Sequence, residues 1–178
     1  MATSFADRIV GAVKLDPKVY EEVEADPNAM GQAVGVVVLS AVAAGIGAFR
    51  MGGAGVVATV IASLTLWFLW AGLTFLIGTK LLPEPQTKAD FGQLLRTIGF
   101  SAAPGFARVL GILPFLGGLI SLAASVWMLV AMVVAVRQAL DYTSTGRAVG
   151  VCLIGFAVYV VAGFMLAMMG LVAAPVVQ

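Results

Sequence analysis

The sequence predicts an all-α, polytopic membrane protein, a helical bundle with five transmembrane helices. Of its 178 residues, 61% are hydrophobic and only 11% are charged, whereas soluble domains have about 25% charged residues. All nine carboxylates and eight of the ten Lys and Arg residues fall within 7–26, 80–97 and 137–147. Because an unpaired charge in the core of a bilayer costs at least about 2–3 kcal/mol, charges collect where membrane helices end.

The N-terminal segment 1–31 is expected to lie in the cytoplasm as two short helices. Phe5, Ile9 and Val13 recur every four residues, which is typical of an amphipathic helix in the headgroup region or against the protein's own cytoplasmic loops. Asp16 followed by Pro17 predicts the start of the second helix, with a capping side chain and a proline at the first helical position. The glutamates of this second helix are interpreted as a solvated face.

Four stretches are long and apolar enough to cross a membrane, which takes about 20 residues: 32–49, 54–79, 115–136 and 148–172. A fifth stretch, 94–113, is weaker because it contains Ser101, Pro104, Gly105 and Arg108. Pro104 and the glycine-rich turn at 111–118 make this the part of the bundle expected to depart most from straight helices.

The distribution of positive charge decides whether 94–113 crosses. If it does, eight basic residues share one side of the membrane, and Arg50 and Arg108 fall on the other: Arg8, Lys14, Lys18, Lys80, Lys88, Arg96, Arg137 and Arg147. If it does not, the split is seven to three. The positive-inside rule favours the first arrangement. We therefore predict five crossings, a cytoplasmic N-terminus and an outward C-terminus.

The composition argues against several classes of function, because the residues that they need are absent. A net charge of +1 gives no reason to expect a nucleic-acid partner. The chain has no histidine and one cysteine, Cys152, so a His/Cys metal site is not expected. No Asp, Glu or His falls within a predicted span, which argues against a proton relay in the membrane. We expect no catalytic residues and no cofactor.

The candidate interaction residues lie mainly in the two cytoplasmic connections. The first connection supplies Lys80, Lys88 and Arg96, and Asp90 is expected to cap the helix that follows it. The second supplies Arg137, Asp141 and Arg147; Arg137 and Asp141 are expected to pair on a helical continuation of the fourth span. Near an anionic membrane surface each basic group contributes about 1 kcal/mol, so anionic lipid is one expected partner.

Arg108 is the only charge within a predicted span. One interpretation is a buried cation that binds an anionic substrate or lipid. The other is a side chain that snorkels to water at the outer interface, because only five residues separate it from Leu113. That short separation favours snorkelling.

Three further stretches carry a resemblance: 15–29 (LDPKVYEEVEADPNA), 69–105 (LWAGLTFLIGTKLLPEPQTKADFGQLLRTIGFSAAPG) and 127–155 (WMLVAMVVAVRQALDYTSTGRAVGVCLIG). With them the chain resembles the Yip1 family, especially its small bacterial members. The resemblance implies five membrane helices, a cytoplasmic N-terminus and an outward C-terminus. The likeness to bacterial members implies a bacterial cytoplasmic membrane. Eukaryotic members are implicated in vesicle traffic through prenylated Rab GTPases, and often carry an Asp-Leu-Tyr-Gly-Pro motif. This chain has no such motif, so Rab binding is not carried over to it.

Three functions remain open at this stage. The first is a non-enzymatic membrane adaptor or membrane-organising protein that acts through its cytoplasmic face on a protein partner or anionic lipid. The second is a small-solute transporter or channel, with a polar path lined by Ser101, Ser121, Ser125, Thr59, Ser63, Thr74 and Arg108. The third is an accessory subunit of a larger membrane complex. Small-residue pairs such as Gly31 and Gly35 suit a packed bundle and leave a homo-oligomer open.

Overall fold

A computed structural model describes residues 3–47 and 52–168 of the chain. These residues form helices joined by turns and contain no strand, which confirms the all-α prediction. The α-helices are α1 (Phe5–Val13), α2 (Pro17–Ala25), α3 (Ala29–Gly47), α4 (Gly52–Leu76), α5 (Phe91–Phe100), α6 (Gly117–Ala139) and α7 (Thr145–Met168). A π-helix, η1 (Ile77–Leu81), extends α4, and a 3₁₀ helix, η2 (Ala103–Ile112), follows α5.

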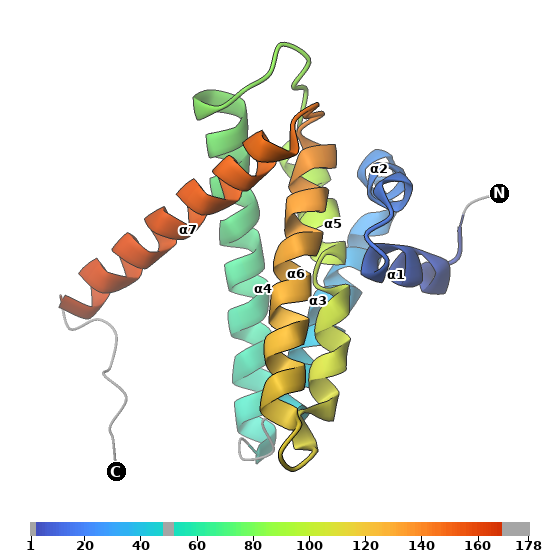
Figure 1. Ribbon diagram of the computed structural model, residues 1–178, viewed down its shortest axis with the longest axis vertical. Helices are drawn as coiled ribbons and strands as arrows, with labels where there is room; N and C mark the ends of the chain where they lie inside the picture. The colour runs from blue at the N-terminus through green and yellow to red at the C-terminus, as the bar shows by residue number, and fades with distance from the viewer. Residues whose placement is uncertain (1–2, 48–51, 169–178) are drawn as a thin grey trace.

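The bundle consists of α3, α4, α6 and the pair α5–η2, which run side by side, while α7 diverges from them along its length (Figure 1). Small residues let α3 and η2 approach closely. A Cβ atom at Gly47 would lie 1.9 Å from the carbonyl oxygen of Arg108, and one at Gly105 would lie 2.0 Å from Ser40 Oγ. Larger residues at these two glycines would therefore push the helices apart, as expected where lipid supplies no hydrophobic drive for association.

Four of the predicted spans are helices long and apolar enough to cross a membrane: Ala29–Gly47, Gly55–Leu81, Gly117–Ala139 and Thr145–Ala162. Large apolar side chains on their outer faces are exposed; Ile61 on α4, Leu119 on α6 and Leu153 on α7 each expose at least 60% of their surface. Such faces are suited to lipid and unsuited to water. The chain is an integral membrane protein. Arg50 and the last residues of the predicted span 148–172 lie outside the described residues.

The fifth predicted span, 94–113, has a more complex structure than a single helix. α5 ends at Phe100 and η2 begins at Ala103, next to Pro104, which has no amide to continue the α-helical pattern. Beyond η2 the chain turns sharply, with Phe115 in the left-handed region at φ 66°. The predicted departure from straight helices is thus confirmed. Together α5 and η2 reach about 35 Å, as do the 23 residues of α6.

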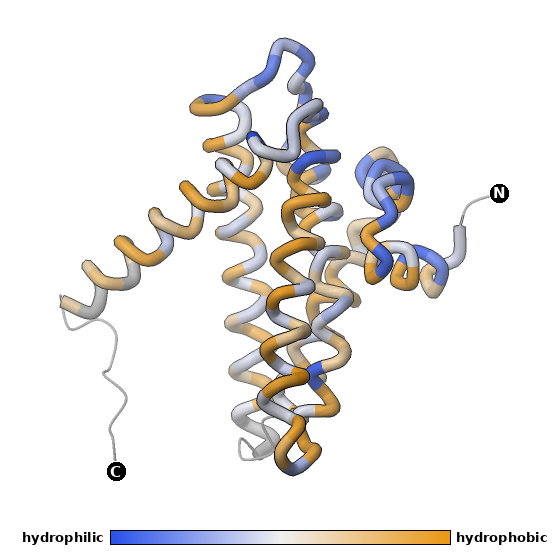
Figure 2. The backbone as a smooth tube through the Cα atoms, in the orientation of Figure 1, coloured by the Kyte–Doolittle hydropathy of each residue, from blue (hydrophilic) through white to orange (hydrophobic). Residues whose placement is uncertain are grey.

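Two predicted helix starts are confirmed by capping contacts. Asp16 accepts a hydrogen bond from the Lys18 amide at the start of α2, with Pro17 at the first helical position. Asp90 and Gln93 cap α5 reciprocally, each side chain bonding to the other residue's amide at 2.8 and 2.6 Å. Hydrophilic residues gather at the end of the bundle where these caps lie, and on the neighbouring α2, whereas apolar residues dominate elsewhere (Figure 2).

Candidate functional site

The hydrophilic end of the molecule is formed by α1, α2 and the two connections 82–90 and 137–147, which we call the polar cap. Arg8 on α1 is its most enclosed charge, at 3% exposure. Its guanidinium donates to Glu22 Oε1 at 2.8 Å, to Asp26 Oδ2 at 2.9 Å and to Gln32 Oε1 at 2.9 Å. It holds the pKa of Asp26 below its usual range. One side chain thereby joins α1, α2 and the first turn of α3.

This network corrects the interpretation of α2 as carrying a solvated glutamate face. Of the glutamates on α2, Glu22 is bonded to Arg8, and Glu24 is partly buried. Burial, followed by repulsion from Asp141, raises the pKa of Glu24 to about 7. Only Glu21 is exposed, and its carboxylate accepts a hydrogen bond from Gln138 at 2.7 Å. The face is therefore largely engaged with the rest of the cap.

The amphipathic helix predicted around Phe5, Ile9 and Val13 is confirmed as α1, and its apolar face packs on the bundle. The Phe5 ring meets Phe100 edge-on at 6.4 Å between centroids. Trp127 on α6 donates from Nε1 to the Val13 carbonyl at 2.7 Å. Because Val10 remains 50% exposed, α1 also presents apolar surface outward.

Arg96 differs from the expectation that it would be available to lipid. It is 7% exposed on α5, and its guanidinium donates to the carbonyl oxygens of Val23, at 2.9 Å, and Glu24. These carbonyls end α2, where a cation complements the negative end of the helix dipole. Arg96 therefore fixes α2 against α5.

Glu84 joins the two connections of the cap. It is buried, accepts hydrogen bonds from the Thr143 amide at 3.0 Å and hydroxyl at 2.8 Å, and pairs with Arg147 at 3.3 Å. The Thr143 amide is the main cause of a lowered Glu84 pKa. Nearby, the Tyr142 hydroxyl lies 3.0 Å from the Gly78 carbonyl oxygen and 2.8 Å from that of Leu82, so it closes the end of η1.

The expected pairing of Arg137 with Asp141 is wrong. α6 ends at Ala139, and Asp141 adopts a left-handed φ of 53°, so the two side chains do not share a helical face. Arg137 instead donates to the carbonyl oxygens of Tyr142 and Thr143, both at 3.2 Å. Arg137 therefore shapes the connection that follows its own helix.

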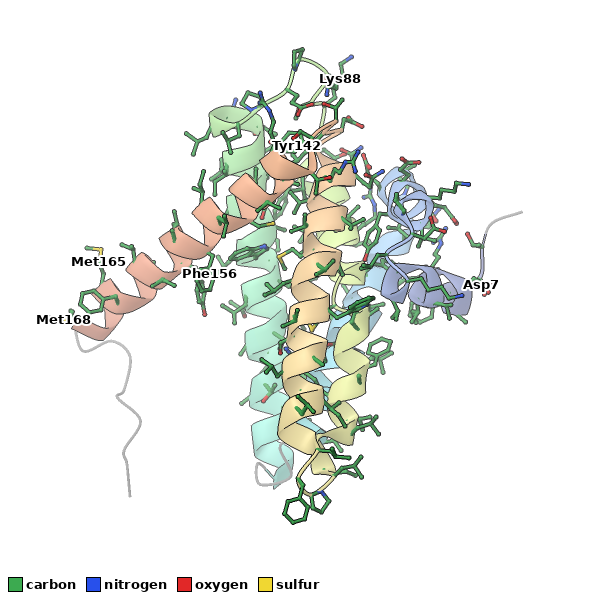
Figure 3. The ribbon with its side chains drawn as sticks, in the orientation of Figure 1. Asp7, Lys88, Tyr142, Phe156, Met165 and Met168 are labelled. Atoms are coloured by element: carbon green, nitrogen blue, oxygen red, sulfur yellow. The ribbon has the colours of Figure 1, made fainter. Side chains whose placement is uncertain are left out.

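A polar recess of about 580 Å³ lies where α2 and the two connections meet, lined by Glu21, Gln86, Arg137, Gln138, Asp141 and Tyr142. Lys80, Lys88 and Asp90 are exposed and are not among the residues that line it. Figure 3 shows Lys88 directed outward from the far end of the first connection and Tyr142 set deeper within the cap. The structure thus brings Arg137 and Asp141 to the recess, and leaves Lys80 and Lys88 facing solvent.

Arg108 lies apart from the cap, on η2. Its Nη2 donates to Ser125 Oγ on α6 at 2.8 Å, and the ion pairs found among the described residues do not involve it. Ser125 in turn donates to the Ser121 carbonyl, and Ser101 to that of Ile98, both within their own helices. Both serine hydroxyls therefore donate to main-chain carbonyls close to them in sequence, which is the usual role of serine in a membrane helix and does not favour a continuous polar path.

Sequence reasoning missed Arg8, Glu84 and Tyr142 as organising residues of the cap. Their partners lie 14 to 64 residues away, and no local spacing marks such contacts. The sequence offered one signal: Glu84 lies between two prolines. Prolines stiffen an extended segment, so a carboxylate between them is well placed to anchor that segment to another part of the protein.

Within residues 3–47 and 52–168, no group of three His, Cys, Asp or Glu side chains is placed to hold a metal ion. The family model described as Yip1 domain matches residues 15–165, which is most of the chain. The chain belongs to the Yip1 family. No curated protein and no solved structure matches it. Membership agrees with the described fold, in which the Yip1 domain begins at the end of α1 and includes both connections of the cap.

Proposed function

We propose that this Yip1-family protein is a non-enzymatic membrane adaptor, or membrane-organising protein, whose polar cap faces the cytoplasm and binds a protein partner. Five crossings, with α5 and η2 together forming the third, would place the N-terminus and both connections on that side. Support comes from the eight-to-two division of basic residues and from the reach of α5–η2. The membrane we propose is a bacterial cytoplasmic membrane.

The observation that carries this proposal is the cap's internal bonding. Arg8 joins α1 to α2, Arg96 joins α2 to α5, and Glu84 joins the two connections to each other. The hydrogen bond from Gln138 to Glu21 joins α2 to the second connection, so the cap is one folded unit. A binding surface held by a rigid scaffold loses little conformational entropy when a partner docks. The cap is therefore suited to recognition, and the polar recess is its most sharply formed feature.

The free charges favour protein over anionic lipid. The basic residues expected to meet lipid are largely engaged elsewhere: Arg96 with α2, Arg137 with its own connection, and Arg147 with Glu84 and Pro83. The exposed charged groups at this end of the molecule have mixed signs: Lys80 and Lys88 are basic, and Glu21, Asp90 and Asp141 are acidic. An anionic membrane attracts a net basic cluster, whereas a mixed pattern is complementary to a protein surface.

Site-specific photocrosslinking in native membranes tests this proposal. A crosslinking residue at Lys88 should give one discrete protein adduct, whereas one at the lipid-facing Leu153 should give lipid adducts. Glu21→Lys should reduce the Lys88 adduct at least about tenfold, the effect of reversing a charge worth about 1.4 kcal/mol at a docking surface. Lys14→Glu, an exposed change on α1, serves as the matched control.

Two results would contradict the proposal. Lipid adducts alone at Lys88 would make anionic lipid the ligand of the cap, and an adduct unchanged by Glu21→Lys would remove the recess from recognition. A partner that co-purifies in fixed stoichiometry would identify the protein as an accessory subunit, which is this function with a permanent partner. A self-adduct would identify a homo-oligomer.

A further inference from the structure

An elongated cavity of about 470 Å³ lies inside the membrane part of the bundle, far from the polar recess. Its volume falls within the about 300–1,000 Å³ usual for ligand pockets. The walls are mainly apolar and come from α3, α4, α5, α6 and η2; Trp67, Trp70, Leu73 and Met132 are among them. Phe156 and Tyr159 of α7 complete one side. Figure 3 shows Phe156 between the diverging α7 and α4.

The cavity is long in the direction of the bundle axis. Along α4 its lining extends from Thr59 to Leu73, a separation of about 21 Å at 1.5 Å per residue. One leaflet contributes about 15 Å of hydrocarbon. A space of this length and lining matches an acyl chain better than a compact polar solute.

Arg108 places a positive charge in the wall of this space, whose other lining residues are mainly apolar with a few hydroxyl side chains. A guanidinium has five N–H donors, and the one hydrogen bond found for it among the described residues goes to the neutral Ser125 hydroxyl. The residue lies on η2, near the turn at the end of the bundle opposite the polar cap. Arg108 therefore lies at one end of the cavity, where it can bind the head group of a lipid whose acyl chain occupies the rest. A charge within a membrane helix is stabilised by an opposite charge, which an anionic head group would supply.

We propose that the cavity holds one acyl chain of an anionic membrane lipid, whose phosphate or carboxylate head group pairs with Arg108. The lipid enters between α4 and α7, where the two helices diverge. Its head group lies in the leaflet opposite the polar cap, so this site is separate from the partner surface of the cap. The fork of Arg108 suits a bidentate contact with either kind of anionic head group.

Tryptophan fluorescence tests this assignment, because Trp67 and Trp70 line the cavity. The full chain is reconstituted in phosphatidylcholine vesicles, and phosphatidylglycerol with brominated acyl chains is added as quencher. We expect saturable quenching by brominated phosphatidylglycerol beyond that by brominated phosphatidylcholine. Unbrominated phosphatidylglycerol should compete for the site, and inorganic phosphate at the same concentration should not.

Two variants make the test specific. Arg108→Leu should weaken the preference for phosphatidylglycerol at least about tenfold, the usual loss when a charge-assisted hydrogen bond is removed. Ser63→Phe keeps Arg108 but places a large side chain in the cavity, where it takes up space that the acyl chain would occupy. It should therefore reduce the saturable quenching. Trp127 lies outside the cavity and is 45% exposed; its background quenching is common to all three proteins and cancels.

Equal quenching by the two lipids in the parent protein would overturn the proposal, as would a preference that survives Arg108→Leu. Competition by inorganic phosphate would show a site for free anions and not for lipid. Should either variant fail to fold, the comparison of the two lipids on the parent protein still decides the question.

Discussion

The arginines at the two ends of the molecule have opposite surroundings. Arg8 and Arg96 in the polar cap are each less than 10% exposed, and meet carboxylates, an amide oxygen or main-chain carbonyls. Arg108 at the other end meets one serine hydroxyl and a cavity. A guanidinium surrounded by its own chain's acceptors stabilises the fold. One that faces open space in an apolar wall is available to a ligand, so under the lipid proposal the same side chain has a structural task at one end and a binding task at the other.

The largest effect in this comparison is expected from Arg8→Leu. The change removes the charge-assisted hydrogen bonds of a guanidinium that is 3% exposed, and it leaves the partly exposed carboxylates of Glu22 and Asp26 without their partner. We expect a loss of about 3 kcal/mol, from hydrogen bonds to a charged group. The loss should be local, because the network joins α1 and α2 to α3. Hydrogen exchange in lipid nanodiscs should show faster exchange of α1 and α2 amides with α4 and α6 unchanged. Lys18→Met, an exposed change, should alter exchange little; equal effects of the two would contradict the assigned role.

Arg96→Met should cost somewhat less, about 2 kcal/mol, because it removes hydrogen bonds to main-chain carbonyls without leaving a carboxylate unpaired. Faster hydrogen exchange should be confined to α2. Arg96→Lys is the informative companion, since one ammonium cannot reproduce the two-point contact. Full protection of α2 in Arg96→Met would show that packing alone holds this helix.

A smaller, pH-dependent effect is expected at Glu24, which is partly buried, repelled by Asp141, Glu21 and Asp90, and attracted by Arg96. Its pKa is about 7 in the folded protein against an ordinary value of 4.5. The folded state therefore binds this proton more tightly, and stability should fall as pH rises from about 4.5 to 7. For this partly exposed group we expect about 1 kcal/mol.

Glu24→Gln should remove that fall and leave the protein more stable than the parent at pH 8. Thermal unfolding in detergent at pH 5 and pH 8 measures both effects. If the melting temperature falls from pH 5 to pH 8 by the same amount in the parent and in Glu24→Gln, Glu24 is not the responsible group.

The smallest effect on stability is expected at Arg108, where lipid binding is the affected property. In phosphatidylcholine, which lacks the proposed anionic ligand, Arg108→Leu should change thermal stability by less than about 0.5 kcal/mol, since it removes a poorly partnered charge from a mainly apolar wall. Arg108→Lys should keep stability and part of the lipid preference, because its charge remains without the fork. A loss of several kcal/mol in Arg108→Leu would place Arg108 with the structural arginines of the cap.

The parts of this fold that sequence predicted depend on short-range chemistry. Asp16 and Asp90 reveal helix starts because a cap and its amide lie within three residues of each other, and four spans follow from apolar length alone. The pairing of Arg137 with Asp141 failed because it assumed a helix that continues past Ala139. No glycine or proline marks the left-handed turn at Asp141.

The candidate site was harder to predict, because burial and partner choice are tertiary properties. Arg96 binds carbonyls 73 and 72 residues away, and nothing in its local sequence separates it from the exposed Lys88. Arg108 was recognised as exceptional from sequence alone. The cavity beside it depends on how α3, α4, α6 and η2 pack, so only the structure shows what its charge faces.

The account places the polar cap and Arg108 on opposite sides of the membrane, which requires α5 and η2 to cross it. Cysteine accessibility tests this crossing directly. In a Cys152→Ala background, Lys88→Cys and Ser144→Cys report the two connections of the cap. In intact cells both should be protected from a membrane-impermeant maleimide, and permeabilisation should expose both. If α5 and η2 do not cross, the second connection lies outside, and Ser144→Cys would label in intact cells while Lys88→Cys stays protected.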